Sequence, residues 1–297
     1  MFVLLGSNGQ ITSQLAALLL AGHHPVRVIG RTPGALAPLK KAGAEVAVGD
    51  AGEARFLEQA MAGARAVYTM IPPCYAEPDM RAAQDRIGSA VAQALTKLRV
   101  PRVVNLSSIG AELPAGTGPI EGLHAQEQRL DAITGIELLH LRAGSFMENF
   151  LPLAGAAANG VLPGMEAPDA PLPMVAVSDI AALAARELVA PQHRGALLLH
   201  APRHVTLGEA AAVIGQAIGN PALRYVQAPP ARFKAELCDQ GFSADAADQL
   251  EVLARWLSTS AGASLMAAPV AVQPTTIELF AQTRFAPVFR QLRAQAA

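Results

Sequence analysis

Two glycines and an arginine near the start of the chain have the types and spacing that bind a phosphorylated nucleotide. Gly6 and Gly9 directly follow an apolar run and precede an apolar helical segment, and Arg31 closes the next apolar run. Such a glycine turn presents backbone N–H groups and a helix N-terminus to a pyrophosphate. We therefore expect six turn residues to bind the pyrophosphate of a dinucleotide: Gly6, Ser7, Asn8, Gly9, Gln10 and Ile11.

Thr12 departs from the usual form of this motif. It occupies the position at which a third glycine normally lets the helix lie close against the strand. The larger side chain predicts a small outward shift of the helix or an adjusted rotamer, and it leaves the N–H groups of the turn in place. An ordinary strand–helix turn that binds no ligand is the alternative interpretation.

The ends of the second and third apolar runs bear on the choice of dinucleotide. NAD sites usually place a carboxylate after the second strand, to bind the ribose 2′-hydroxyl, but here the residue is Arg31. A guanidinium pairs instead with a 2′-phosphate, so NADP(H) is favoured over NAD(H), with a solvated surface arginine as the alternative. Asp50, after the third run, is expected either to accept a hydrogen bond from the adenine amino group or to cap a helix at 54–62.

Alternating apolar runs and helical segments must position these residues. We expect strands at 1–5, 26–31, 45–50, 66–71, 103–108 and 136–142, and a long helix at 80–98. This alternation predicts an α/β fold built on a parallel sheet, whose ligands bind at the carboxyl ends of the strands. Ile71 and Pro72 after the fourth strand, and Ser107 in the fifth, are therefore expected to contact the ligand.

Composition excludes several classes of protein. The 297 residues are 52% hydrophobic and 16% charged, with a net charge of −1, which gives no electrostatic case for nucleic acid or an anionic membrane. No apolar stretch reaches the roughly 18 residues of a membrane span, and no basic segment precedes the first apolar run. Only Cys74 and Cys238 occur, so we expect no disulfide framework, no metal site and a cytoplasmic location. Cys74 is expected to be a bystander rather than a nucleophile.

Several segments, taken in order, resemble the NmrA-like group of atypical short-chain dehydrogenases/reductases. The most specific is Phe146-Met147-Glu148-Asn149. The resemblance implies a Rossmann-type doubly wound parallel sheet at 1–150, to which later segments return, and a smaller α/β substrate region at 151–297. It also implies NADP(H) in the crevice between them. The matching segments are 6–12, Arg31, 49–50, 107–111, 141–149, 177–181 and 274–280.

The chain departs from the wider superfamily at the catalytic positions. That superfamily uses a Tyr-x-x-x-Lys pair on the helix after the fifth strand, but the tyrosines here are Tyr68, Tyr75 and Tyr225. His124 stands near the position where the NmrA-like pattern commonly keeps a lysine. It is a candidate proton donor, a ribose ligand or an ordinary half-exposed histidine. Ser107 is expected either to bond substrate or cofactor or simply to end its strand.

The second half of the chain offers candidate substrate contacts and helix starts. Tyr75, Phe146, Asn149 and Phe233 are expected to contact the substrate, with Phe146 also beside the nicotinamide. Phe233, with Phe242 and Trp256, has the alternative of being ordinary core. Ser178 or Asp179 is expected to cap a helix at 181–188, and residues 206–209 form a capping box.

Three functions remain open. Hydride transfer depends more on positioning than on acid–base help, which favours an NADPH-dependent reductase of a small apolar acceptor: a quinone, an azo compound or an activated alkene. The alternative is a non-catalytic NADP(H) sensor that acts through a protein partner. A sugar-nucleotide epimerase-like activity is least favoured, because that chemistry depends on the missing tyrosine and lysine.

Overall fold

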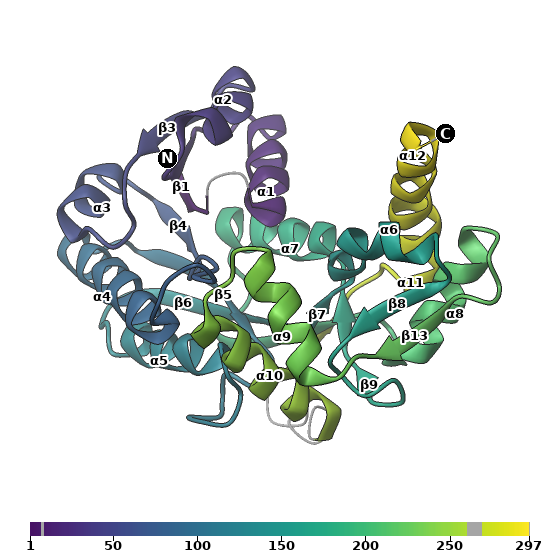
Figure 1. Cartoon of the computed structure of the whole chain (residues 1–297). Helices are drawn as coiled ribbons and strands as arrows, with labels where there is room; N and C mark the ends of the chain where they lie inside the picture. The colour runs from purple at the N-terminus through teal and green to yellow at the C-terminus, as the bar shows by residue number, and fades with distance from the viewer. Residues whose placement is uncertain (7–8, 260–268, 297) are drawn as a thin grey trace.

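A parallel sheet of eight strands forms the centre of the protein (Figure 1). The computed structural model describes residues 1–6, 9–259 and 269–296. The strand order is β14-β11-β6-β5-β4-β1-β2-β3, and every neighbouring pair is parallel. The strands are β1 (Phe2–Leu5), β2 (Val26–Gly30), β3 (Glu45–Val48), β4 (Ala66–Thr69), β5 (Arg102–Ser108), β6 (Glu137–Ala143), β11 (Gly195–His200) and β14 (Val270–Val272).

Helices cover both faces of this sheet. Those on one face include α1 (Gln10–Ala21), α2 (Pro33–Lys41) and α7 (Val177–Val189), and those on the other include α3 (Ala54–Ala60), α4 (Met80–Leu98) and α5 (Ile120–Asp131). The chain order reverses between β1 and β4, where ligands bind in doubly wound sheets. The predicted Rossmann-type α/β fold is therefore confirmed.

The first strand shows why these apolar runs fold as central strands. Phe2 and Leu4 pack into the core beneath α1 and α7, whereas Val3 and Leu5 pack into the core beneath α3 and α4. All four side chains are at most 2% exposed. A parallel strand that is covered on both faces needs apolar residues at successive positions, and the sequence supplies them.

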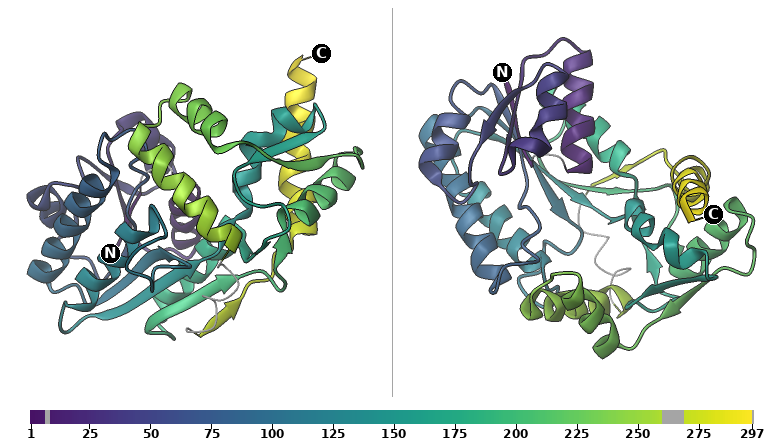
Figure 2. Two further views of the ribbon diagram at one scale, coloured as in Figure 1. Left: turned by 60° about the horizontal axis from the view of Figure 1, so that its bottom comes forward. Right: turned by 45° about the horizontal axis from the view of Figure 1, so that its top comes forward.

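The second half of the chain extends the sheet and adds small paired strands. In Figures 1 and 2, α9 (Pro230–Asp239) and α10 (Ala244–Thr259) lie between the sheet and the β8–β13 region. β14, which the apolar pattern did not predict, is a short edge strand with exposed valines at both ends. The remaining elements are β7 (Ser145–Phe146), η1 (Met147–Leu153), α6 (Ala154–Ala157), β8 (Val161–Gly164), β9 (Pro171–Leu172), β10 (Met174–Val175), β12 (Val205–Thr206), α8 (Leu207–Ala217), β13 (Arg224–Gln227), α11 (Ile277–Phe280), η3 (Ala281–Phe285) and α12 (Ala286–Ala296).

Two predicted helix starts turn out differently. The capping box before α8 is confirmed, because Thr206 and Glu209 bond each other's backbone N–H groups. The predicted cap of α7 is wrong, since the helix begins at Val177, whose N–H donates to the carboxylate of Glu148 at 3.0 Å. Asp179 instead accepts hydrogen bonds from the backbone N–H and the hydroxyl of Thr275, at 3.0 and 2.9 Å.

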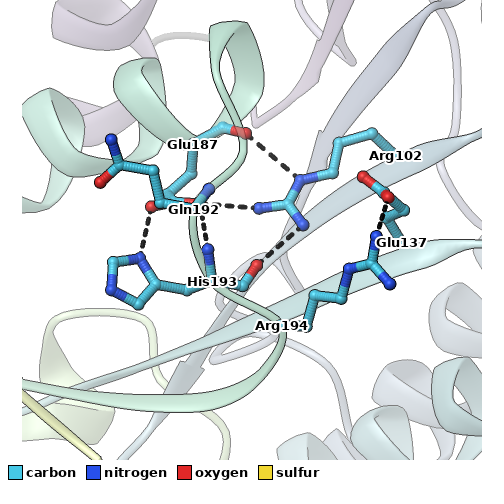
Figure 3. A network of polar contacts seen from close by, with 6 residues as sticks. All are labelled: Arg102, Glu137, Glu187, Gln192, His193 and Arg194. Carbon is cyan, nitrogen blue, oxygen red and sulfur yellow. Dashed lines mark hydrogen bonds and ion pairs between the residues drawn. The ribbon is translucent and has the colours of Figure 1, made fainter.

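A buried polar network fixes the amino end of the sheet (Figure 3). Arg102, the first residue of β5, pairs with Glu187 near the end of α7 at 2.9 Å and donates to the carbonyl of His193 at 3.0 Å. Glu187 also accepts from the backbone N–H groups of Gln192 and His193 and from the His193 ring. The network ties β5 and α7 to the loop before β11, on the edge opposite to Ser107.

No helix among the described residues is both long enough and apolar enough to cross a membrane.

Candidate functional site

Two neighbouring cavities open at the carboxyl ends of the strands. The β1–β3 cavity, about 310 Å³ in volume, has walls from the ends of the first three strands, and the β4–β6 cavity, about 380 Å³, has walls from the ends of the next three. Met70, Pro72 and Pro73 belong to both walls, so the two cavities adjoin at the switch point of the sheet. Ile71 and Pro72, predicted to contact the ligand, both line the β4–β6 cavity.

The glycine turn lies in the wall of the β1–β3 cavity. Gly6 has a φ of +130°, and a Cβ added there would lie 2.6 Å from Thr12 Oγ1, so both the backbone conformation and the space require glycine. In the described part of the chain, the first turn of α1 has no acidic residue and no side-chain cap. Its N–H groups therefore offer a site for an anion. Ser7 and Asn8 lie outside the described residues.

The helix after the turn is anchored by apolar packing and by Thr12. Ile11 packs into the core beneath α1, while Gln10 is exposed. Thr12 is 2% exposed, and its hydroxyl donates to the carbonyl of Leu5 at 3.5 Å. The threonine is thus accommodated by directing its hydroxyl toward the end of β1, over Gly6.

Arg31 and Arg86 bring two guanidinium groups to the β1–β3 cavity. Arg86 pairs with Asp50 at 2.9 Å, and the other Asp50 oxygen accepts from the Gly52 N–H at 2.8 Å. These contacts, the Gly52 bond first, hold the pKa of the Asp50 carboxyl below its usual range. The helix-capping alternative for Asp50 is wrong, because α3 follows Glu53 without a side-chain cap. Arg31 is exposed, and no described carboxylate lies within ion-pair distance of it.

Ser107 contributes an oriented hydroxyl to the β4–β6 cavity. It is 3% exposed, and its hydroxyl donates to Glu127 at 2.5 Å. Arg142 holds the same carboxylate through bonds of 3.1 and 2.6 Å. Burial alone raises the pKa of Glu127, but the bonds from Arg142, the charge of His140 and the Ser107 bond together bring it below its usual range. Since the Ser107 proton is directed at Glu127, its oxygen can serve the cavity as a hydrogen-bond acceptor.

Glu127 and one face of α10 are functional features that sequence reasoning missed. Leu250, Leu253 and Leu257 line the β4–β6 cavity at intervals of three and four residues. That spacing is a helical stripe and could have indicated a face turned toward a ligand or a core. The signal for Glu127 was weaker, because its partner Arg142 lies on the next strand rather than on the same helix.

Three of the four predicted substrate residues come together in the β4–β6 cavity. Tyr75, Phe146 and Asn149 line it, and Tyr75 stacks on Phe242 with ring centroids 4.8 Å apart. Phe233 instead packs in a small separate cluster with Met165, Leu237, Ala247 and Ala254. Phe242 thus supports a wall residue, and Phe233 does not meet the other three.

His124 and Cys74 occupy positions without an evident part in the chemistry. The Nδ1 of His124 lies 2.8 Å from the carbonyl of Ala111, which can only accept, so Nδ1 carries the proton. Within the described ranges, neither cavity wall includes His124, and its donor role stays a prediction. Cys74 lines the β1–β3 cavity, but burial raises the pKa of its thiol, which makes it a weak nucleophile.

Known proteins with similar sequences are reductases by name. The chain is 29% identical over 227 residues to the (4-alkanoyl-5-oxo-2,5-dihydrofuran-3-yl)methyl phosphate reductase of Streptomyces griseus, a match that covers 76% of each chain. It is 27% identical over 256 residues to the NAD(P)H azoreductase of Xenophilus azovorans, which covers 85% of this chain and 86% of the relative.

A solved structure shares the fold over the full length. The NADPH-dependent quinone oxidoreductase of Escherichia coli, solved with NADPH, superposes with a TM-score of 0.71 at 24% identity, covering 99% of this chain and 100% of that one. The model of the NmrA-like family matches residues 2–278, which confirms the resemblance found in the sequence. The chain belongs to the NmrA-like family.

Proposed function

We propose that this protein is an NADPH-dependent reductase of small apolar acceptors. The observation that carries the proposal is the pair of adjoining cavities at the switch point of the sheet. One offers an uncapped helix N-terminus and an unpaired arginine, and the other offers apolar walls with one oriented hydroxyl. The class, an oxidoreductase with a nicotinamide cofactor, agrees with the names of the relatives.

The residues of the β1–β3 cavity fit the adenosine and phosphate parts of NADP(H). Gly6, Gly9 and the first turn of α1 would bind the pyrophosphate, since these positions combine close backbone approach with free N–H groups. Arg31 would bind the 2′-phosphate, because its charge has no described partner. When bound, the cofactor supplies a hydride equivalent to the acceptor.

The residues of the β4–β6 cavity would position the acceptor and exclude water. Tyr75 and Phe146 provide flat aromatic contacts, and the leucines of α10 close the apolar wall. The Ser107 oxygen, held by Glu127, would accept a hydrogen bond from the carboxamide of the cofactor or from the acceptor. These walls suit quinones, azo compounds and activated alkenes, and two of the similar proteins are named for an azo substrate and a quinone.

The test combines binding with turnover. Calorimetric titration with NADPH, NADP and NADH is followed by measurement of NADPH oxidation against a panel of quinones, azo dyes and enones. We expect tight NADPH binding together with turnover of at least one neutral acceptor. Tight binding that distinguishes the oxidised from the reduced cofactor, with no turnover of any acceptor, would contradict this function and support the sensor.

A further inference from the structure

A single charged side chain, Glu166, stands among the described residues that line the β4–β6 cavity. It lies in the loop after β8, on the side of the cavity that belongs to the second half of the chain. The rest of that wall is apolar or neutral, and no lysine, arginine or histidine belongs to the described part of it. The carboxylate therefore dominates the electrostatics of the acceptor pocket.

The charge of Glu166 is not neutralised by a cation of the protein. Its Oε2 accepts a hydrogen bond from the hydroxyl of Tyr225 at 3.2 Å, and no described Lys, Arg or His lies within ion-pair distance. Burial, and then the nearby Glu166 charge, raise the pKa of the Tyr225 phenol, which remains a neutral donor. Residues 260–268, which follow α10, contain no charged side chain in the sequence.

An uncompensated carboxylate in an apolar pocket discriminates between ligands by charge. A cationic ligand gains Coulomb attraction that water screens poorly in such a pocket, whereas an anionic ligand of the same shape is repelled. A neutral ligand experiences neither effect. The geometry of Glu166 therefore affects selectivity more than general affinity.

The supply of protons in this cavity favours the same class of ligand. The Ser107 proton is directed at Glu127, and burial raises the pKa of the Tyr75 phenol, which makes it a poor acid. Reduction of a quinone or an azo group requires a proton in addition to the hydride. A cationic carbon accepts the hydride, forms one C–H bond and becomes neutral, while the reduced cofactor loses two electrons and no further proton is needed.

We propose that Glu166 selects positively charged, planar aromatic acceptors with an electrophilic carbon over anionic acceptors of the same shape. The inference rests on the proposed reductase function and specifies its substrate class. The electrons come from NADPH, and the product is the neutral, reduced form of the cation. Glu166 contacts the acceptor through its charge and does not take part in bond formation.

The experiment compares acceptors that differ in charge. The probes are a triarylmethyl cation dye, a sulfonated triarylmethyl dye of net negative charge, and a neutral quinone. They are assayed with the wild type, with Glu166→Gln, which keeps an acceptor for Tyr225, and with Asp169→Asn as a matched control. Asp169 is exposed in the same loop, so its variant makes the same change in net charge outside the cavity wall.

Two readouts are measured for each variant. KM comes from NADPH oxidation, and Kd comes from the visible absorbance of each dye bound to the protein saturated with NADP⁺, which requires no turnover. We expect the wild type to bind the cation at least about tenfold more tightly than the anion, and Glu166→Gln to weaken cation binding about tenfold. The quinone KM should change less than about twofold, and Asp169→Asn should leave all three probes unchanged.

The possible failures are distinguishable. Equal effects of Glu166→Gln on cation, anion and quinone, or an equal effect of Asp169→Asn, would overturn the inference. If no acceptor is reduced, including the neutral quinone, the proposed function fails. The charge selectivity is then judged by dye binding alone, and equal Kd values for the two dyes overturn it.

Discussion

Removing the Arg31 side chain tests the choice of cofactor most directly. Arg31 lines the β1–β3 cavity, is exposed and has no described carboxylate partner, so the predicted ligand of its guanidinium is the 2′-phosphate. In Arg31→Ala the phosphate loses a charge-assisted hydrogen bond, and such bonds contribute about 1.5–3 kcal/mol. Because the side chain is exposed and screened by salt, we take about 2 kcal/mol, which corresponds to about a 30-fold higher Kd for NADPH.

The assay is calorimetric titration with NADPH and with NADH at two salt concentrations. NADH lacks the 2′-phosphate, so its Kd should change by less than about twofold. The NADPH effect should shrink as salt rises, because the lost interaction is electrostatic. Arg55→Ala serves as the control, since Arg55 is exposed on α3 and does not line the cavity. Equal losses for NADPH and NADH would refute the 2′-phosphate assignment, as would an equal effect of Arg55→Ala.

Three further variants test the site and the fold. Glu187→Gln should lower the free energy of unfolding by about 3 kcal/mol in urea titrations, because it leaves the buried Arg102 guanidinium without its counter-charge. Contacts led by the His193 bond outweigh the effect of burial and lower the pKa of Glu187, so this stabilisation is full above the unfolded pKa near 4.3 and is lost as pH falls through the folded pKa. The wild type should therefore lose stability in acid more steeply than Glu187→Gln, and parallel pH profiles would contradict the assignment. Ser107→Ala should lower kcat/KM for NADPH oxidation about fivefold through loss of one hydrogen bond, with unchanged thermal unfolding as its control. His124→Ala should leave turnover within about twofold, because the ring bonds the Ala111 carbonyl and lies outside the described cavity walls; a large loss of kcat would support the proton-donor role instead.

The sheet could be predicted because its strands obey a local rule. A central parallel strand is buried on both faces, so Phe2 to Leu5 appears in the sequence as an uninterrupted apolar run. The glycine turn was equally visible, because the φ of Gly6 and the space around it require glycine. β14 escaped prediction, since three residues at a sheet edge with exposed valines carry no such pattern.

The site was only partly predictable because its contacts join distant segments. Ser107 was predicted from its place at a strand end, but its bond to Glu127 depends on how α5 packs against the sheet. Likewise, Asp179 was expected to cap its own helix, whereas its carboxylate bonds Thr275, which lies 96 residues further along the chain. Local patterns locate such residues on an element and do not specify their partners.

The position of β11 has a consequence for how the chain is made. β6 ends at Ala143, yet its second neighbour, β11, begins at Gly195 and is itself covered only by β14 at 270–272. During synthesis the first half therefore leaves the ribosome with an open sheet edge, whose unpaired N–H and C=O groups can pair with other chains. That edge closes only after about 270 residues have emerged. A nascent chain stalled at residue 150 would hold the whole glycine turn and still be a substrate for chaperones.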